Sequence, residues 1–310
     1  MFIMSEKYVL GIDIGGTYIK YGYIDQYFTI QKQWKKETRH FATKDEFYDY
    51  LCEGIDAEIV ECVGISTPGL IDRTSLVKTR AAKTVENMYG TTVNEEVGKR
   101  LNKFTATIND AKAAGLCELK IGNAQGTKSS GYLIIGTGVG GCLCNSEDVI
   151  YGNDGFAGEV HFIPYYDAAT GKILKLGNQC SMRKLIQLYN EKVSEDSQVQ
   201  YGMEVTEKYL AKDPVACEVM KVWIQNLVMD VINMVVTYNP EIICIGGGIS
   251  EEEWFIKLLQ EKYREISVPF FNATEEFLTT KITNCKYNNS SNLLGAAIKV
   301  TMEKEKLKNL

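Results

Sequence analysis

The sequence predicts an α/β protein built from two related lobes. Its 310 residues suffice for two α/β domains, and a content of 45% hydrophobic and 24% charged residues is typical of a soluble globular protein. Residues 8–25 and 132–150 share one pattern, in which an apolar strand, a glycine-rich turn and a second strand follow one another. Strand-like and helix-like segments then alternate along the chain, which favours sheets rich in parallel strands.

The first half begins with the strand–turn–strand segment at residues 8–25. Apolar residues at helical spacing predict an amphipathic helix at 44–54. An acidic residue suits a helix N-cap, so Asp110 predicts the start of another helix. The other elements of this half are expected at residues 61–66 (strand), 92–101 (helix), 105–109 (strand) and 110–121 (helix).

The second half repeats this order with more helix. Its second long helix should stop before Pro240, because a proline disfavours helical backbone at the preceding residue. The elements are expected at residues 180–193 (helix), 215–238 (helix), 241–245 (strand), 246–248 (turn), 251–265 (helix) and 292–305 (helix). We place an N-terminal lobe at 1–120 and a C-terminal lobe at 121–292, with the last helix, 293–310, packing back on the first lobe.

Composition and charge exclude several function classes. A net charge of −6 argues against nucleic acid or an anionic membrane surface as a partner. The longest apolar runs fall short of the ~20 residues that a bilayer requires, and the first residues do not resemble a secretion signal, so we expect a cytoplasmic protein. The nine cysteines include no C-x-x-C pair, which predicts reduced thiols.

The first glycine-rich turn is a candidate phosphate site. Gly15 and Gly16 follow an apolar strand, and adjacent glycines allow a sharp turn with positive φ that leaves N–H groups uncovered for an anion. The hydroxyl of Thr17 adds a donor, and Asp13 could hold Mg²⁺ through water. Lys20 could neutralise phosphate charge or be a solvated strand residue. An ordinary structural hairpin explains one such turn equally well.

Two further glycine clusters follow buried strands, at residues 136–141 and 246–248. No helix follows the first of them, which excludes a dinucleotide-binding βαβ unit. Three strand-to-glycine clusters fit a nucleotide held between two lobes better than three unrelated turns. The candidate nucleotide contacts here are Thr137, Gly138, Gly140, Gly247 and Gly248.

Seven motifs in order resemble the ROK family (repressors, open reading frames and kinases): IDIGGT, VGISTPG, NDAKAAGLCE, IGTGVGG, AGEVH, PEIICIGGG and NLLGAA. The resemblance covers nearly the whole chain. It implies the two-lobed actin/hexokinase-like (ribonuclease H-like) fold with an interlobe cleft, the use of ATP and Mg²⁺, a sugar substrate and a homodimer. Repressors of the family carry an N-terminal helix-turn-helix. Only seven residues precede the first strand here, so we expect the kinase branch, and a non-catalytic sugar-binding regulator is the alternative.

The resemblance also assigns roles to single residues. Asp110 alone would be a plain helix cap, but it matches the family's catalytic base, which takes the proton of the sugar hydroxyl that attacks the γ-phosphorus. Asn109 matches a ligand of the sugar hydroxyls. Glu159 and His161 match further sugar ligands, and at positions i and i+2 of an extended segment they would share a face. Asn87 is similar to a polar sugar contact of the family.

Three more residues, Ser66, Thr67 and Gly69, should line the same mouth. The second histidine, His40, is interpreted as a surface residue. An actin-like filament subunit and an acetate- or glycerol-type kinase are rival interpretations, and neither accounts for Asn109-Asp110 together with the full motif order.

One motif departs from the family pattern. Many ROK proteins bind a structural zinc through the histidine that matches His161 and a C-x-C-G-x-x-G-C-x-E run, whereas residues 177–185 offer only Cys180. A tetrahedral site needs about four ligands, so we predict no structural zinc. Residues 79–90 and 178–190 resemble zinc-lacking β-glucoside kinases. This predicts transfer to the 6-hydroxyl of a β-glucoside such as cellobiose, with a glucose, fructose or N-acetylmannosamine kinase as the alternative.

Overall fold

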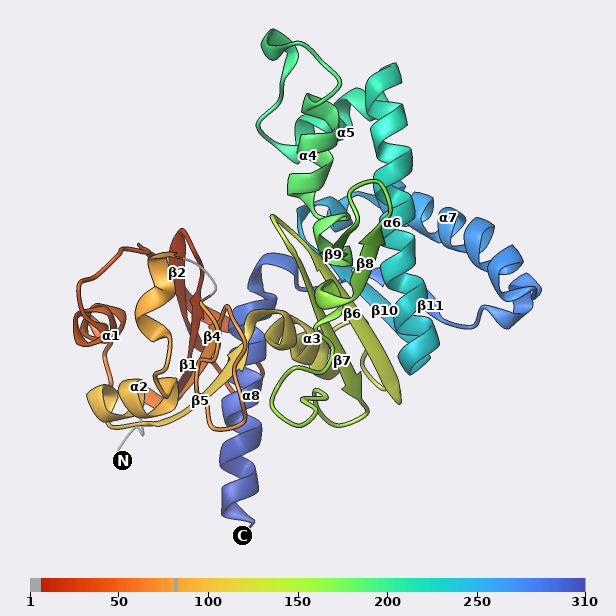
Figure 1. Ribbon diagram of the computed structural model, residues 1–310. Helices are drawn as coiled ribbons and strands as arrows, with labels where there is room; N and C mark the ends of the chain where they lie inside the picture. The colour runs from red at the N-terminus through yellow and green to blue at the C-terminus, as the bar shows by residue number, and fades with distance from the viewer. Residues whose placement is uncertain (1–6, 81–82, 310) are drawn as a thin grey trace. The chain divides into compact units, whose positions relative to one another are not determined.

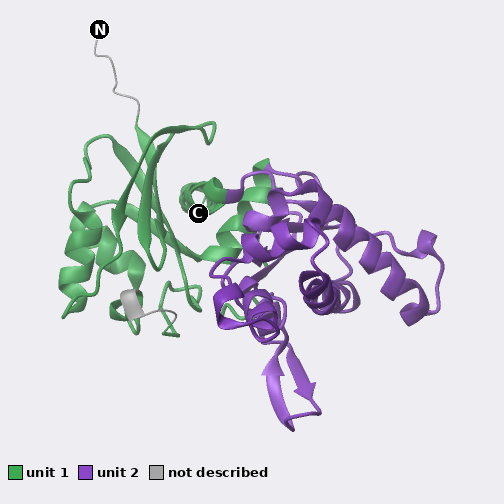
Figure 2. Ribbon diagram, turned by 90° about the horizontal axis from the view of Figure 1, so that it is seen from above, with its two compact units in different colours: residues 1–121, 149–157, 289–310 green, residues 122–148, 158–288 purple. Residues whose placement is uncertain are grey.

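The computed structural model describes residues 7–80 and 83–309, and it confirms an α/β protein (Figure 1). The chain divides into two compact units (Figure 2). Unit 1 comprises residues 1–121, 149–157 and 289–310, and unit 2 comprises residues 122–148 and 158–288. Relative to the ranges expected from the sequence, 1–120 and 293–310, unit 1 also contains residues 121, 149–157 and 289–292.

Unit 1 contains a five-stranded sheet in the order β3-β2-β1-β4-β5. Its strands are β1 (Tyr8–Ile14), β2 (Tyr18–Ile24), β3 (Ile30–Glu37), β4 (Val60–Thr67) and β5 (Phe104–Asn109). The pairs β1–β2 and β2–β3 are antiparallel, whereas β1–β4 and β4–β5 are parallel. Because parallel strands end at the same edge of a sheet, the residues that close β1, β4 and β5 lie together.

The helices of unit 1 cover this sheet, and some of them pack so closely that only glycine fits at the contact. They are α1 (Lys44–Cys52), the 3₁₀ segment η1 (Lys83–Met88), α2 (Val93–Leu101), α3 (Asp110–Ile121) and α8 (Ser291–Lys308). A Cβ on Gly64 of β4 would lie 2.0 Å from the carbonyl oxygen of Ala296, and one on Gly295 would lie 1.9 Å from that of Ala113. The C-terminal helix therefore packs backbone to backbone against both β4 and α3.

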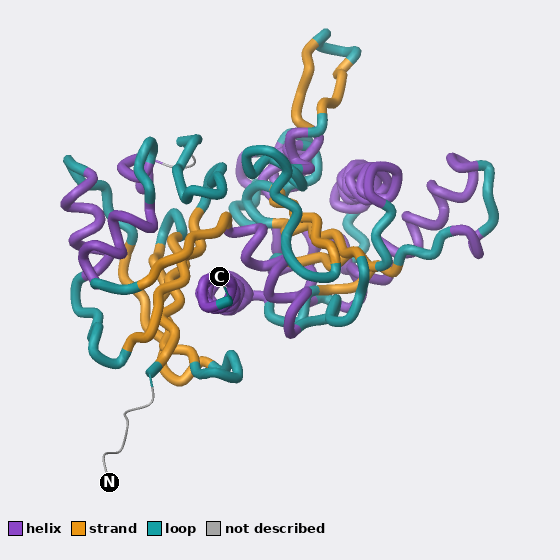
Figure 3. The backbone as a smooth tube through the Cα atoms, turned by 90° about the horizontal axis from the view of Figure 1, so that it is seen from below, coloured by secondary structure: helices purple, strands orange, loops and turns teal. Residues whose placement is uncertain are grey.

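Unit 2 contains a four-stranded sheet in the order β11-β10-β6-β7. Its strands are β6 (Ser129–Ile135), β7 (Val139–Asn145), β10 (Ile242–Gly246) and β11 (Lys281–Asn284). The antiparallel hairpin β6–β7 confirms the predicted likeness to β1–β2, and β6, β10 and β11 are parallel. A separate hairpin of β8 (Pro164–Asp167) and β9 (Lys172–Lys175) projects from unit 2 (Figure 3).

Four helices complete unit 2: α4 (Met182–Asn190), α5 (Gly202–Leu210), α6 (Pro214–Tyr238) and α7 (Glu253–Phe271). By length and composition α6 is the one candidate membrane span in the described part of the chain, although 56% of its apolar window is buried inside the protein. Trp223 of α6 is fully buried, and its indole N–H donates to the carbonyl of Ser181 at 2.9 Å. This packing is that of a core helix.

Candidate functional site

The junction of β5 and α3 carries Asn109 and Asp110. The side-chain oxygen of Asn109 accepts a hydrogen bond from the backbone N–H of Lys112 at 3.2 Å, so Asn109 caps α3 and the expected cap Asp110 does not. The Oδ1 atom of Asp110 instead accepts from the side-chain amide of Asn109 at 2.9 Å and from the N–H of Ala111 at 2.8 Å. Asn109 is buried and Asp110 half-buried. The Asp110 carboxylate is thus oriented at the sheet edge.

Asp13 lies at the same edge of the sheet, at the end of β1, and is buried. Its Oδ1 accepts from the hydroxyl of Ser66 at 3.1 Å and from the amide of Asn292 at 3.2 Å, and its Oδ2 lies 3.6 Å from the ammonium of Lys20. Asn292, at the start of α8, is a site residue that the sequence does not predict. Its motif NLLGAA belongs to the family pattern, but nothing local in the sequence indicates this contact.

The turn between β1 and β2 consists of Gly15, Gly16 and Thr17, and the last two are exposed. Gly15 does not adopt the positive φ expected from the sequence. It must be glycine because a Cβ would lie 2.8 Å from the carbonyl of Tyr18, whose oxygen accepts the Gly15 N–H at 3.0 Å. The hydroxyl of Thr38 donates to the Gly15 carbonyl at 2.7 Å, which fixes the base of the turn.

Gly69 and Asn87, two further predicted site residues, make different kinds of hydrogen bond. Gly69 has φ of 95°, which favours glycine, and its carbonyl accepts from the Asn109 amide at 3.0 Å. The side-chain N–H of Asn87 in η1 donates to the carbonyl of Phe41 at 3.0 Å. The Oδ1 of Asn87 is buried and finds no hydrogen-bond partner in the described part of the chain, so it could accept from a ligand hydroxyl. Residues 81–82 of the segment 79–90 lie outside the described residues.

The two glycine clusters of unit 2 lie side by side. Gly246 pairs with Ile134 in the parallel register of β10 and β6, so the end of β10 meets the end of β6. Gly247 has φ of 94°, and a Cβ there would lie 1.9 Å from the carbonyl of Ile135. Thr137 and Gly138 in the β6–β7 turn are exposed, as is Gly248. Gly140 follows in β7, so the five predicted nucleotide contacts of this unit share one sheet edge.

Glu159 precedes the 3₁₀ turn η2 (Val160–Phe162) and His161 lies within it, so the expected extended segment is wrong. The turn still brings their side chains together, with Nδ1 of His161 3.6 Å from Oε2 of Glu159. Gly158 has φ of 81°, and a Cβ there would lie 2.9 Å from the backbone nitrogen of Leu143 in β7. This close approach places Glu159 and His161 next to the β6–β7 hairpin, which carries the second glycine turn.

A buried acidic pair lies where the zinc run of the family would be expected. The thiol of Cys180 donates to Oδ2 of Asp230 at 2.9 Å, and both side chains are fully buried. Oδ1 of Asp230 has no hydrogen-bond partner among residues 7–80 and 83–309. Burial raises the pKa of Asp230 to about 7 and also raises that of the Cys180 thiol. Unit 2 therefore holds this carboxyl largely protonated below neutral pH.

Metal ligands are sparse in this chain. Among the residues that the structure describes, no group of three or more His, Cys, Asp or Glu is placed to hold a metal ion. Asp13, with Ser66 and Asn292 beside it, suits a hydrated Mg²⁺ that takes its other ligands from phosphates.

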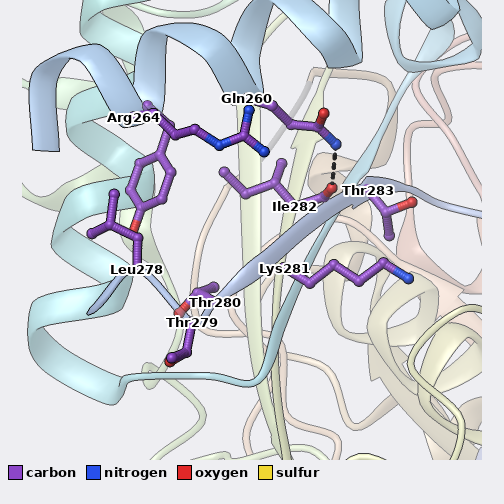
Figure 4. A pocket seen from close by; sticks show the side chains of 9 residues that line it. Gln260, Arg264, Leu278, Thr279, Thr280, Lys281, Ile282 and Thr283 are labelled. Atoms are coloured by element: carbon purple, nitrogen blue, oxygen red, sulfur yellow. Dashed lines mark hydrogen bonds between the residues drawn. The ribbon is translucent and has the colours of Figure 1, made fainter. Parts of the chain in front are cut away.

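A cavity of about 290 Å³ lies between α7 and β11 (Figure 4). Its wall includes the bond from the Gln260 amide to the carbonyl of Ile282, at 2.8 Å. Arg264 and Lys281 line it, and the lining includes none of the predicted site residues. The cavity is therefore not made by the predicted site residues.

Comparison with known proteins places these features in a family. The family model described as "ROK family" matches residues 9–303. A glucokinase from Thermotoga maritima is 26% identical over 316 residues, which cover 95% of this chain and 97% of the relative. A β-glucoside kinase from Klebsiella pneumoniae is 25% identical over 261 residues, which cover 82% of this chain and 86% of the relative.

Solved structures share the fold. A ROK family protein from Streptococcus pneumoniae TIGR4 in complex with sucrose has a TM-score of 0.83 and 22% identity, and covers 96% of this chain and 99% of its own. A ROK family glucokinase from Streptomyces griseus in complex with glucose and AMPPNP has a TM-score of 0.75 and 22% identity, with coverage of 95% and 99%. These similarities confirm the predicted two-lobed, actin-like fold.

Proposed function

The chain belongs to the ROK family, and on that premise we propose that it is an ATP-dependent sugar kinase. The observation that supports this best is the β5–α3 junction. There Asn109 takes over the capping of α3, and the Asp110 carboxylate is held by two N–H donors while only half-buried. A carboxylate fixed in this way is suited to accept a proton from a hydroxyl.

In this mechanism some residues bind the sugar and another takes its proton. Asn109, Glu159 and His161 bind and orient the sugar hydroxyls, with Asn87 and Gly69 at the margin. The oxygen of the attacking sugar hydroxyl bonds to the γ-phosphorus, and the bond from that phosphorus to the β–γ bridging oxygen breaks. Asp110 takes the proton that the hydroxyl loses. Phosphoryl transfer needs mostly positioning and charge neutralisation, and these residues provide the positioning.

The phosphates of ATP are proposed to contact the glycine turns. The proposed contacts are the exposed turn residues Gly16, Thr17, Thr137 and Gly138, because glycine has no Cβ to block a phosphate and threonine adds a hydroxyl donor. Lys20 adds a positive charge beside Asp13. Mg²⁺, held through water by Asp13, would neutralise phosphate charge during transfer.

We propose that the sugar is a β-glucoside such as cellobiose, phosphorylated on the 6-hydroxyl. Two features support this: the absence of the glutamate of the zinc run, which in many members of the family contacts the anomeric end of the sugar, and the similarity to a β-glucoside kinase. A monosaccharide kinase or a non-catalytic regulator is the alternative. Measurement of ADP release with Mg-ATP distinguishes them: turnover of cellobiose supports the proposal, turnover of monosaccharides alone discards the specificity, and sugar binding without turnover indicates a regulator.

The base assignment is tested by Asp110→Asn. The amide keeps an oxygen for the donors Asn109 and Ala111 but cannot accept the proton, so kcat should fall by about 10²- to 10⁴-fold with little change in sugar affinity. Asp45→Asn, in the first turn of α1, is the matched control. Near-normal turnover of the Asp110 variant would refute the assignment.

We further propose a cytoplasmic homodimer that binds neither nucleic acid nor membrane. The net charge of −6 and the buried core of α6 support the second part, and the family resemblance supports the dimer. Sedimentation velocity checks the oligomeric state, and a monomer at all concentrations would refute it.

A further inference from the structure

An exposed aromatic side chain stands directly beside the proposed sugar ligand His161. The ring centroid of Phe162 lies 4.0 Å from that of His161, with the planes at 42°, and Phe162 is 37% exposed. The ammonium of Lys175 in β9 lies 4.0 Å from the centroid of the same ring. An apolar ring, a cation and an imidazole therefore meet at one place on the surface of unit 2.

The hairpin register extends this surface away from His161. Pro164 pairs with Lys175, and Tyr166 pairs with Ile173. Paired residues and residues two apart share a face of a hairpin, so Lys175, Tyr166 and Ile173 lie on one face. Tyr166 is 66% and Ile173 75% exposed. We call Phe162, Lys175, Tyr166 and Ile173 the aromatic strip. Tyr165 and Leu174 lie on the opposite face.

The chemistry of the strip suits a neutral sugar. A pyranose presents apolar C–H groups on its faces and hydroxyls around its rim. Aromatic rings cover the faces, while an ammonium and a phenol hydroxyl bind the rim. Asp167 is two residues from Tyr165 and shares the other face, so the strip has no carboxylate. Two residues along a strand span about 7 Å, comparable with the length of one hexose unit.

We propose that the aromatic strip is the subsite for the second sugar ring of a β-glucoside, the ring attached at the anomeric carbon of the phosphorylated glucose. This inference rests on the proposed function, because Glu159 and His161 must hold the first ring. It adds the residues that determine specificity: Phe162 with Lys175 contacts the second ring, and Tyr166 with Ile173 contacts a third ring in longer substrates.

The test uses three variants of the full chain. Phe162→Leu keeps apolar volume beside His161 but removes the aromatic face, and Tyr166→Ser removes a ring far from His161. Tyr165→Ser is the matched control, since it alters the same residue type on the same strand but on the opposite face. The measured quantity is the ratio of kcat/KM for cellobiose to kcat/KM for glucose, together with cellobiose affinity by calorimetry.

Phe162→Leu should lower this ratio and the cellobiose affinity by about tenfold, the effect of one lost ring contact. Tyr166→Ser should lower the ratio of kcat/KM for cellotriose to kcat/KM for glucose by a similar factor. Tyr165→Ser should leave both the cellobiose ratio and the cellotriose ratio unchanged. Equal losses for glucose and cellobiose would overturn the inference. So would a shift in oligomeric state on Tyr166→Ser with unchanged ratios, which would assign the face to a second copy of the chain.

Failure of the kinase proposal gives a different result. If the wild type turns over no sugar but Phe162→Leu weakens cellobiose binding and leaves glucose binding unaltered, the subsite stands and the catalytic function falls. If the wild type phosphorylates sugars but binds cellobiose no more tightly than glucose, the kinase stands and the subsite is overturned.

Discussion

Asn109 and Asp110 have different tasks at the start of α3. The oxygen of a side chain that caps a helix accepts hydrogen bonds from backbone N–H groups of the first turn. Asn109 accepts from Lys112 and donates to Asp110 and Gly69, so it joins β5, α3 and the turn after β4. Asp110 is therefore positioned by its neighbour instead of serving the helix.

Asp230 gives a prediction about pH and stability. Its pKa is about 7 in the folded protein and near 3.8 ordinarily, so the folded state binds more protons between those values. This contribution to the free energy of unfolding is fully present below about pH 4, falls as the pH rises toward 7, and is lost above it. Asp230→Asn, which has no charge to bury, should flatten this slope in denaturant unfolding at pH 5, 6 and 7.

Asp196→Asn is the control for that measurement. Asp196 lies in an exposed 3₁₀ turn of the same unit, so its substitution should leave the slope in place. An unchanged slope in the Asp230 variant would show that this carboxyl does not titrate with folding.

At the scale of elements, the glycine turns depend on close backbone contacts. Gly247 joins β10 to the following 3₁₀ turn at a point where only glycine fits against the carbonyl of Ile135. The contact holds the ends of β6 and β10 together, and with them two of the three glycine clusters. These turns are therefore parts of the sheet edge as well as candidate phosphate sites.

Gly247→Ala should lower the free energy of unfolding by at least about 2 kcal/mol, because it adds a clash to a positive φ. Gly248→Ala is the matched control. A Cβ on Gly248 meets nothing within 4 Å, so its effect on stability should stay within about 0.5 kcal/mol. Urea denaturation measures the free energy of unfolding of both variants. Equal decreases would show that any side chain in this turn is destabilising, and that the contact with Ile135 is not the cause.

Elements with a strong periodic pattern are predictable from sequence, and those at edges are not. The helix expected at 110–121 is α3, and the helix expected at 215–238 is α6 with one residue added. The strands β3 and β11 are sheet edges with lysines, so their apolar pattern is weak. The sequence also gives no signal for the hairpin β8–β9 and the helix α5, because exposed side chains interrupt their patterns.

The candidate site is predictable where it follows chain order. The neighbouring sequence indicates the positions of Asn109 and Asp110, which lie at a strand end, and of the glycines, which follow strands. Asn292 contacts Asp13 across 279 residues of sequence, and only the packing of α8 on the sheet brings them together. The turn that joins Glu159 to His161 is predicted as extended chain, because a segment of three residues gives no periodicity.

For the whole molecule, the absence of a zinc run changes how unit 2 is stabilised. Its core is built on α6, with Cys180 bonded to Asp230 inside it. We expect 1,10-phenanthroline to leave the thermal unfolding midpoint unchanged, since no metal would be withdrawn from the fold. EDTA should abolish phosphoryl transfer by removing Mg²⁺, and excess Mg²⁺ should restore it. A lower midpoint with phenanthroline, or stoichiometric zinc in the purified protein, would contradict this.

The close packing of α8 has a consequence for how the protein is made. The ribosome makes residues 1–121 first, yet unit 1 also needs residues 289–310, which follow unit 2 in the chain. Gly64 and Ala113 can make their contacts with Ala296 and Gly295 only after those later residues have been synthesised. Unit 2 is complete in the nascent chain by residue 288, so it can fold first. Unit 1, which carries Asp110, can therefore be completed only after unit 2 has been synthesised.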